Sequence, residues 1–172
     1  MKKFLGVVVL GIAFSSVVAA ADPTPEDAEK LLKKLKVSVK PDKKNNITRV
    51  DLGKKKIADA DLATIAALKT LQSLDLSGTP IGDEGLKNIA NLTDLRSLML
   101  ANTAITDEGL KHLAKMKNLT MLVLNGTKVT DAGLEELKKL AKLDTLQLFE
   151  TKITDTGIFS LKRWKMDLKI SK

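Results

Sequence analysis

Apolar residues along most of this chain recur with a fixed period of 24 residues. Six columns of identical residues follow this period in register, and each column has four members. A fixed period between about 20 and 50 residues indicates a protein built from stacked units. The pattern therefore predicts coils of equal length whose leucines merge into one core. The six columns begin at Leu71, Leu74, Leu76, Thr79, Asp83 and Gly85.

Each unit contains a short alternating segment and then a segment with apolar residues three positions apart. Alternation at residues 98–100 predicts a short strand. The spacing of Leu110, Leu113 and Met116 predicts a helix or helical turn on the opposite wall. Thr106 and Asp107 precede this helix, and we expect their side-chain oxygens to accept its free amide hydrogens. A helix of about ten residues is not stable alone, so it must pack on neighbouring coils.

The Leu-x-x-Leu-x-Leu core at residues 71–76 and its three copies resemble the leucine-rich repeat family. The tail Thr-x-Ile-Thr-Asp-x-Gly-Leu is similar to a bacterial subtype found in planctomycete-like proteins. The resemblance implies an α/β fold, a right-handed βα solenoid or horseshoe of about five repeats with parallel strands on its concave face. It covers residues 47–172, with a degenerate first unit and a further strand at residues 168–170. Where the family usually carries Asn or Cys, this chain has Thr79 and its copies, whose hydroxyls can bond the loop backbone.

The chain divides into three parts, residues 1–21, 22–46 and 47–172. The first part has two lysines, an apolar run and small residues at its end, which predicts a secretory signal peptide. The alternative is an uncleaved membrane anchor. The second part has Pro25 with acidic residues after it, which predicts a leader and a helix that caps the first coil. The third part is the solenoid. We therefore expect an exported protein, in the periplasm or the extracellular space.

The net charge of +8 is concentrated toward the two ends of the predicted solenoid. Residues 22–56 hold 11 basic and 6 acidic side chains, whereas residues 57–161 hold 11 and 14. Residues 162–172 hold 5 basic side chains and 1 acidic one. Lysines at an open sheet edge discourage pairing with foreign strands, and this is the favoured interpretation. The alternative is that the basic ends bind an anionic cell-envelope surface.

Residue types that support catalysis are scarce, because the chain has no cysteine or tyrosine and one histidine, His112. His112 lies at a polar position of a predicted helix, so a Ser-His-Asp arrangement is not expected. The column that begins at Asp83 offers carboxylates, but calcium needs roughly six or more oxygens, and no second carboxylate column faces this one. We therefore expect no enzyme and no cofactor. Nucleic acid is not an expected partner, because aromatic residues do not interleave the basic stretches.

Side chains between the core leucines point toward the concave strand face, where solenoids bind their ligands. Apolar residues gather over the later strands of this face beside polar ones, a pattern typical of a protein interface. The alternative is that scattered apolar residues are ordinary on any surface. We expect a protein or peptide ligand, and membrane contact only through an uncleaved signal segment. The predicted binding residues are Met99, Ala101, Met121, Val123, Phe149, Asp75, Asn125 and Gln147.

Overall fold

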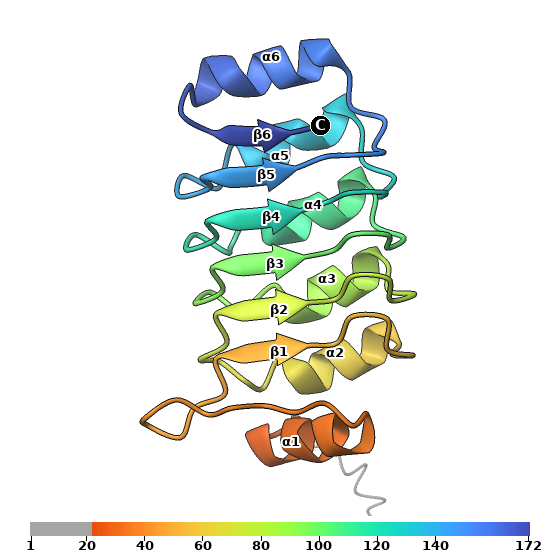
Figure 1. Cartoon of the computed structure of the whole chain (residues 1–172), viewed down its shortest axis with the longest axis vertical. Coiled ribbons are helices and arrows are strands. Elements are labelled where there is room, and N and C mark those ends of the chain that lie inside the picture. Colours follow the sequence, from red (N-terminus) through yellow and green to blue (C-terminus); the bar gives the residue numbers. More distant parts are fainter. Residues whose placement is uncertain (1–21) are drawn as a thin grey trace, which may run out of the picture.

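The computed structural model describes residues 22–172 (Figure 1). The predicted signal peptide, residues 1–21, lies outside the described residues. Strands and helices alternate along the chain after an initial helix. The elements are α1 Pro25–Lys34, β1 Arg49–Asp51, α2 Asp59–Ile65, β2 Ser73–Asp75, α3 Asp83–Ile89, β3 Ser97–Met99, α4 Asp107–Leu113, β4 Met121–Val123, the 3-10 helix η1 Asp131–Gly133, α5 Leu134–Leu137, β5 Thr145–Gln147, α6 Asp155–Trp164 and β6 Lys169–Ser171.

The strands of residues 22–172 form one parallel sheet in chain order, from β1 to β6. Neighbouring strands pair with a shift of 24 residues, so that Leu74 faces Leu98 and Leu98 faces Leu122. In Figure 1 the strands of the sheet face the viewer, and the helices α2 to α5 lie behind them. The predicted α/β solenoid is confirmed, since equal coils stack with their leucines on adjoining strands.

The core lies between the sheet and the helices and runs the length of the stack. The central residues of β2 to β5 have no exposed surface, and neither do Leu110 and Leu113 of α4. Burying one leucine contributes about 1.5–3 kcal/mol. The helices α2, α3 and α4 have seven residues each, fewer than the ten expected. Because such helices are unstable alone, packing of each coil on its neighbours supplies their stability.

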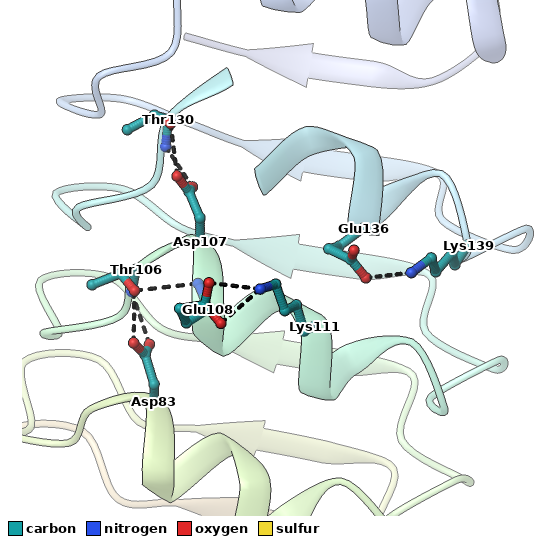
Figure 2. Close-up of polar contacts among 8 residues, drawn as sticks. All are labelled: Asp83, Thr106, Asp107, Glu108, Lys111, Thr130, Glu136 and Lys139. Carbon is teal, nitrogen blue, oxygen red and sulfur yellow. Dashed lines mark hydrogen bonds and ion pairs between the residues drawn. The ribbon is translucent and has the colours of Figure 1, made fainter. Parts of the chain in front are cut away.

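A ladder of carboxylates joins the start of each helix to the next coil (Figure 2). Asp83 accepts hydrogen bonds from the backbone N–H and the hydroxyl of Thr106, with donor–acceptor distances of 2.9 and 2.6 Å. Asp107 accepts the same pair from Thr130 at 2.8 and 2.7 Å. Asp131 repeats the arrangement with the next threonine at 2.8 and 2.6 Å. The expectation that these carboxylates cap their own helices was therefore wrong, because they bond to the following coil.

The threonine of each ladder step caps the helix that follows it. The Thr106 hydroxyl donates to Asp83 and accepts the backbone N–H of Glu108 at 3.3 Å. Thr130 and Thr154 accept helix amides in the same way. A hydroxyl has one donor and two acceptor positions, so one threonine can serve both coils.

A second threonine column closes the turn after each strand within its own coil. The buried hydroxyls of Thr79, Thr103 and Thr127 donate to the carbonyl oxygens three residues earlier, at 2.6, 2.7 and 2.6 Å. The expected bond from threonine to the loop backbone is therefore present.

The glycine column has a direct steric cause in the carboxylate ladder. A Cβ added at Gly133 would meet a carboxylate oxygen of Asp107 and would lie 2.8 Å from Cδ1 of Leu110. Gly85, Gly109 and Gly157 are crowded in the same way by the preceding coil. Glycine is required at these positions because a side chain from the neighbouring coil occupies the space of its Cβ.

Helix α1 lies at the N-terminal end of the stack and packs on α2 (Figure 1). Thr24 and Asp27 form a reciprocal capping box at its start, and Ala28 and Leu32 are buried. This placement agrees with a capping role, although the boundary between the leader and the solenoid stays a prediction. No helix in the described part of the chain is both long and apolar enough to cross a membrane.

The substitution Gly133→Ala should destabilise the protein by about 1–3 kcal/mol, because the new methyl group overpacks the contact with Asp107. Urea unfolding measures this loss. The matched control is Gly82→Ala, where the nearest atom to an added Cβ is 3.8 Å away, so that only the N-cap preference for glycine is lost and the effect should be smaller. Equal effects of the two glycine substitutions would contradict this explanation.

The ladder should also make stability depend on acid pH. The hydroxyl and the backbone N–H of Thr154 hold the pKa of Asp131 below its ordinary value of 3.8. A carboxyl whose pKa is lowered by folding stabilises the protein above its unfolded pKa, and this contribution is lost as the pH falls through the folded pKa. Asp131→Asn should therefore flatten the fall in urea-unfolding stability between neutral pH and about pH 2–3. An unchanged acid dependence would count against the ladder.

Candidate functional site

The strand face, defined here as the outer surface of β1 to β6, carries the two flanking residues of each three-residue strand. In β1 the flanking residues are exposed and the central Val50 is buried. In β2, β3 and β5 the flanking residues are half-buried and the central residue is buried. Successive strand residues point to opposite faces, so the buried leucines force their neighbours outward. The period thus builds the face from two outward rows along the stack.

A hollow of about 570 Å³ lies on the strand face over β1 to β4. Its floor combines methionine side chains with serine hydroxyls and four charged groups. The lining residues of this strand-face hollow are Thr48, Arg49, Val50, Asp51, Gln72, Ser73, Asp75, Arg96, Ser97, Met99, Thr120 and Met121.

The charged groups of the strand-face hollow take part in no ion pair within residues 22–172. Asp51 and Asp75 are Cα partners on adjacent strands. One oxygen of each accepts the backbone N–H two residues later, at 2.9 Å for Gly53 and 2.8 Å for Ser77. Because the second oxygen of each has no protein hydrogen bond, the hollow offers two acceptors to a ligand.

Three of the predicted residues, Asp75, Met99 and Met121, line the strand-face hollow. Met121 is 37% exposed, and Phe149 is 46% exposed farther along the stack. The expectation that Val123 lies in an exposed patch was wrong, because its exposed fraction is 8%. Met99 and Gln147 are its Cα partners on either side, and we attribute its burial to these longer side chains.

Three of the other predicted residues, Asn125, Gln147 and Phe149, form a bonded group over β4 and β5. The Asn125 amide donates to the side-chain oxygen of Gln147 at 3.1 Å, and its oxygen accepts the backbone N–H of Phe149 at 3.0 Å. Ala101, which occupies the equivalent position after β3, is half-buried. These bonds join adjacent coils, and Asn125 holds the backbone at the exposed Phe149.

Sequence reasoning missed the residues that lie immediately before the strands. Gln72, Arg96 and Thr120 all line the strand-face hollow, although they precede β2, β3 and β4. They occupy one column of the 24-residue period, together with Thr48. The 24-residue period itself marks this column, one position ahead of each strand.

The basic C-terminal end is largely bonded within the chain. Lys162 donates to the carbonyl oxygen of Leu168, and Lys165 donates to the carbonyl oxygens of two residues of the preceding coil. Lys169 pairs with Asp144 at 3.4 Å, and Lys172 pairs with Asp155 at 2.6 Å. The hydroxyl of Thr145 and the neighbouring Lys169 hold the pKa of Asp144 below its ordinary value.

Features that could support catalysis are few in the described chain. His112 is half-buried on α4. No group of three or more His, Asp or Glu residues within residues 22–172 is arranged to hold a metal ion. On α4, Glu108 pairs with Lys111 at 2.6 Å and raises the lysine pKa. Glu136 of α5 pairs at 2.6 Å with Lys139, which follows that helix (Figure 2). Such surface pairs contribute little to stability and are ordinary surface features.

The fold and the sequence agree with one class of protein. A Leucine Rich repeat family model matches three consecutive segments, residues 67–90, 91–114 and 115–138. This match shows leucine-rich repeats over residues 67–138, which lie within the parallel sheet and alternating helices of the solenoid. A comparison with curated proteins finds no match.

Several solved structures share this fold. A leucine-rich repeat protein of Leptospira interrogans is 24% identical over 64% of this chain and 27% of that one, with a TM-score of 0.51. An internalin of Listeria monocytogenes is 23% identical over 84% of this chain and 48% of that one, with a TM-score of 0.55. Internalin C2 of the same species is 22% identical over 73% and 74%, with a TM-score of 0.51. This chain thus spans about a quarter and a half of the first two proteins, and at these identities the likeness concerns the fold alone.

The substitution Asn125→Ala should destabilise the protein by about 1–2 kcal/mol, because it removes two bonds between coils and leaves the Phe149 N–H without its acceptor. Thermal and urea unfolding measure this loss. Ser97→Ala is the matched control, since the Ser97 hydroxyl makes no protein hydrogen bond and is only half-buried. A neutral Asn125→Ala would show that the group contributes nothing to the stack.

Proposed function

We propose that this protein binds a protein or peptide partner through its strand face, as an exported, non-enzymatic interaction protein. The observation that carries the proposal is the strand-face hollow, which combines two methionines with four charged groups that have no ion-pair partner in the described chain. An apolar floor with a polar margin is typical of protein interfaces. Solenoids commonly use the surface built by their repeats for binding.

Binding of an anionic envelope surface through the basic ends stays an alternative prediction. The C-terminal end supports it weakly, because four of its five basic side chains already bond within the chain. The charged groups of the strand-face hollow, in contrast, are available. Placement in the periplasm or outside the cell follows from the predicted signal peptide and forms part of the proposal.

The test is recovery of partners from an envelope extract by the full chain and by the double variant Met121→Asp plus Phe149→Asp. Both side chains are exposed, so charging them should remove binding with little loss of stability. Mass spectrometry of the recovered proteins reads the result. Washes at low salt and at about 0.5 M salt separate the alternatives, because charge-driven binding through the ends is screened by salt.

The matched control is Phe159→Asp, which charges a 65% exposed aromatic residue of α6, away from the strand-face hollow. Partners of the strand face should be lost with the double variant and retained with the control. Equal recovery by all three proteins would contradict the proposed function.

A further inference from the structure

Two adjacent carboxylates at one edge of the strand-face hollow lack a cation. Asp51 and Asp75 lie directly beside each other on β1 and β2, which are parallel strands spaced about 4.8 Å apart. Like charges in facing positions of a sheet repel and destabilise it. Within residues 22–172 no lysine or arginine forms an ion pair with either carboxylate. A cation placed between them would remove this repulsion.

The two arginines of the strand-face hollow lie at the opposite ends of the strands from the acidic pair. Arg49 precedes Asp51 by two residues on β1, and Arg96 precedes β3. Both therefore belong to the amino-terminal side of the strands, whereas the carboxylates close the carboxyl-terminal side of β1 and β2. The hollow thus has a basic edge and an acidic edge, and each one selects a ligand group of opposite charge.

An apolar floor begins one strand after the acidic pair. Met99 of β3 is the Cα partner of Asp75. Met121 of β4 is the Cα partner of Ser97 on β3. Both methionines line the hollow, and Met121 is 37% exposed. Methionine side chains adjust their shape to varied apolar groups. The acidic pair and the methionines are about two strand spacings apart, or roughly 10 Å, a distance covered by about three residues of extended chain.

We propose that the strand-face hollow binds an extended segment of a partner protein that carries a basic side chain and an apolar side chain about three residues apart. The lysine or arginine lies over Asp51 and Asp75, and the apolar side chain lies on Met99 and Met121. This inference rests on the proposed function and adds the chemistry of the partner to it. The hollow, at about 570 Å³, has room for a few side chains of such a segment.

The probe is a random peptide library displayed on phage and selected on the immobilised full chain. Peptides with lysine or arginine near a large apolar residue should be enriched, and synthetic copies should bind about five- to tenfold more weakly to Asp51→Asn plus Asp75→Asn. Asparagine keeps the shape and can still accept the N–H groups of Gly53 and Ser77, so the fold should persist. Glu84→Gln plus Glu108→Gln is the charge-matched control, because these exposed carboxylates lie on α3 and α4 and do not line the hollow, and it should bind the peptides as the native chain does.

The outcomes separate this inference from the proposed function. Enriched peptides that are acidic or uncharged, or that bind the double asparagine variant as well as the native chain, overturn the basic-segment inference. If those same peptides are lost with Met121→Asp, strand-face binding still stands. Peptides whose binding survives Met121→Asp plus Phe149→Asp contradict the proposed function itself. A library from which nothing is enriched overturns the inference as well.

Discussion

Stacking of equal coils requires that each coil satisfy polar groups of the next, and the aspartate ladder does this at every helix start from Asp83 to Asp131. The backbone N–H of the threonine ahead of a helix would otherwise lack a partner at the stack surface. A carboxylate from the preceding coil accepts it and the hydroxyl together. That geometry requires glycine at the crowded position on the following helix, where a Cβ would enter the carboxylate. The aspartate, threonine and glycine columns are therefore parts of one arrangement.

This constraint leaves the strand face free to vary. Core positions must be leucine or a similar residue to fuse the coils, and ladder positions must keep their partners. Neither requirement applies to the outward residues of the strands, and these residues differ from coil to coil. In one outward row, two aspartates are followed by methionine, valine and glutamine. Departure from the period is thus concentrated on the surface with the hollow, where a ligand could reach it.

The repeat predicted the strands, the core and the register, because leucine columns leave one way to bury their side chains. It could not assign the partner of Asp107, since capping its own helix and bonding the next coil fit the same spacing. Burial of Val123 depends on the length of side chains one strand away, which a single column does not show. Lys54 and Glu150 adopt positive φ in a turn column that holds Gly78 and Gly126 elsewhere, so the residue types do not mark this left-handed turn in every coil. Arg96 was missed because it precedes its strand.

The two ends of the stack differ in how they are closed, and this difference bears on function. The helix α1 covers the first coil and buries Leu32 there. At the other end Asp155 accepts a hydrogen bond from the ammonium of Lys172, whereas Asp83, Asp107 and Asp131 accept from a threonine. Lys165 likewise bonds carbonyl oxygens of the preceding coil. These lysines therefore bond within the described chain, which leaves fewer cations free for an anionic partner. The unpaired charges of the strand face remain the groups best placed to select a ligand.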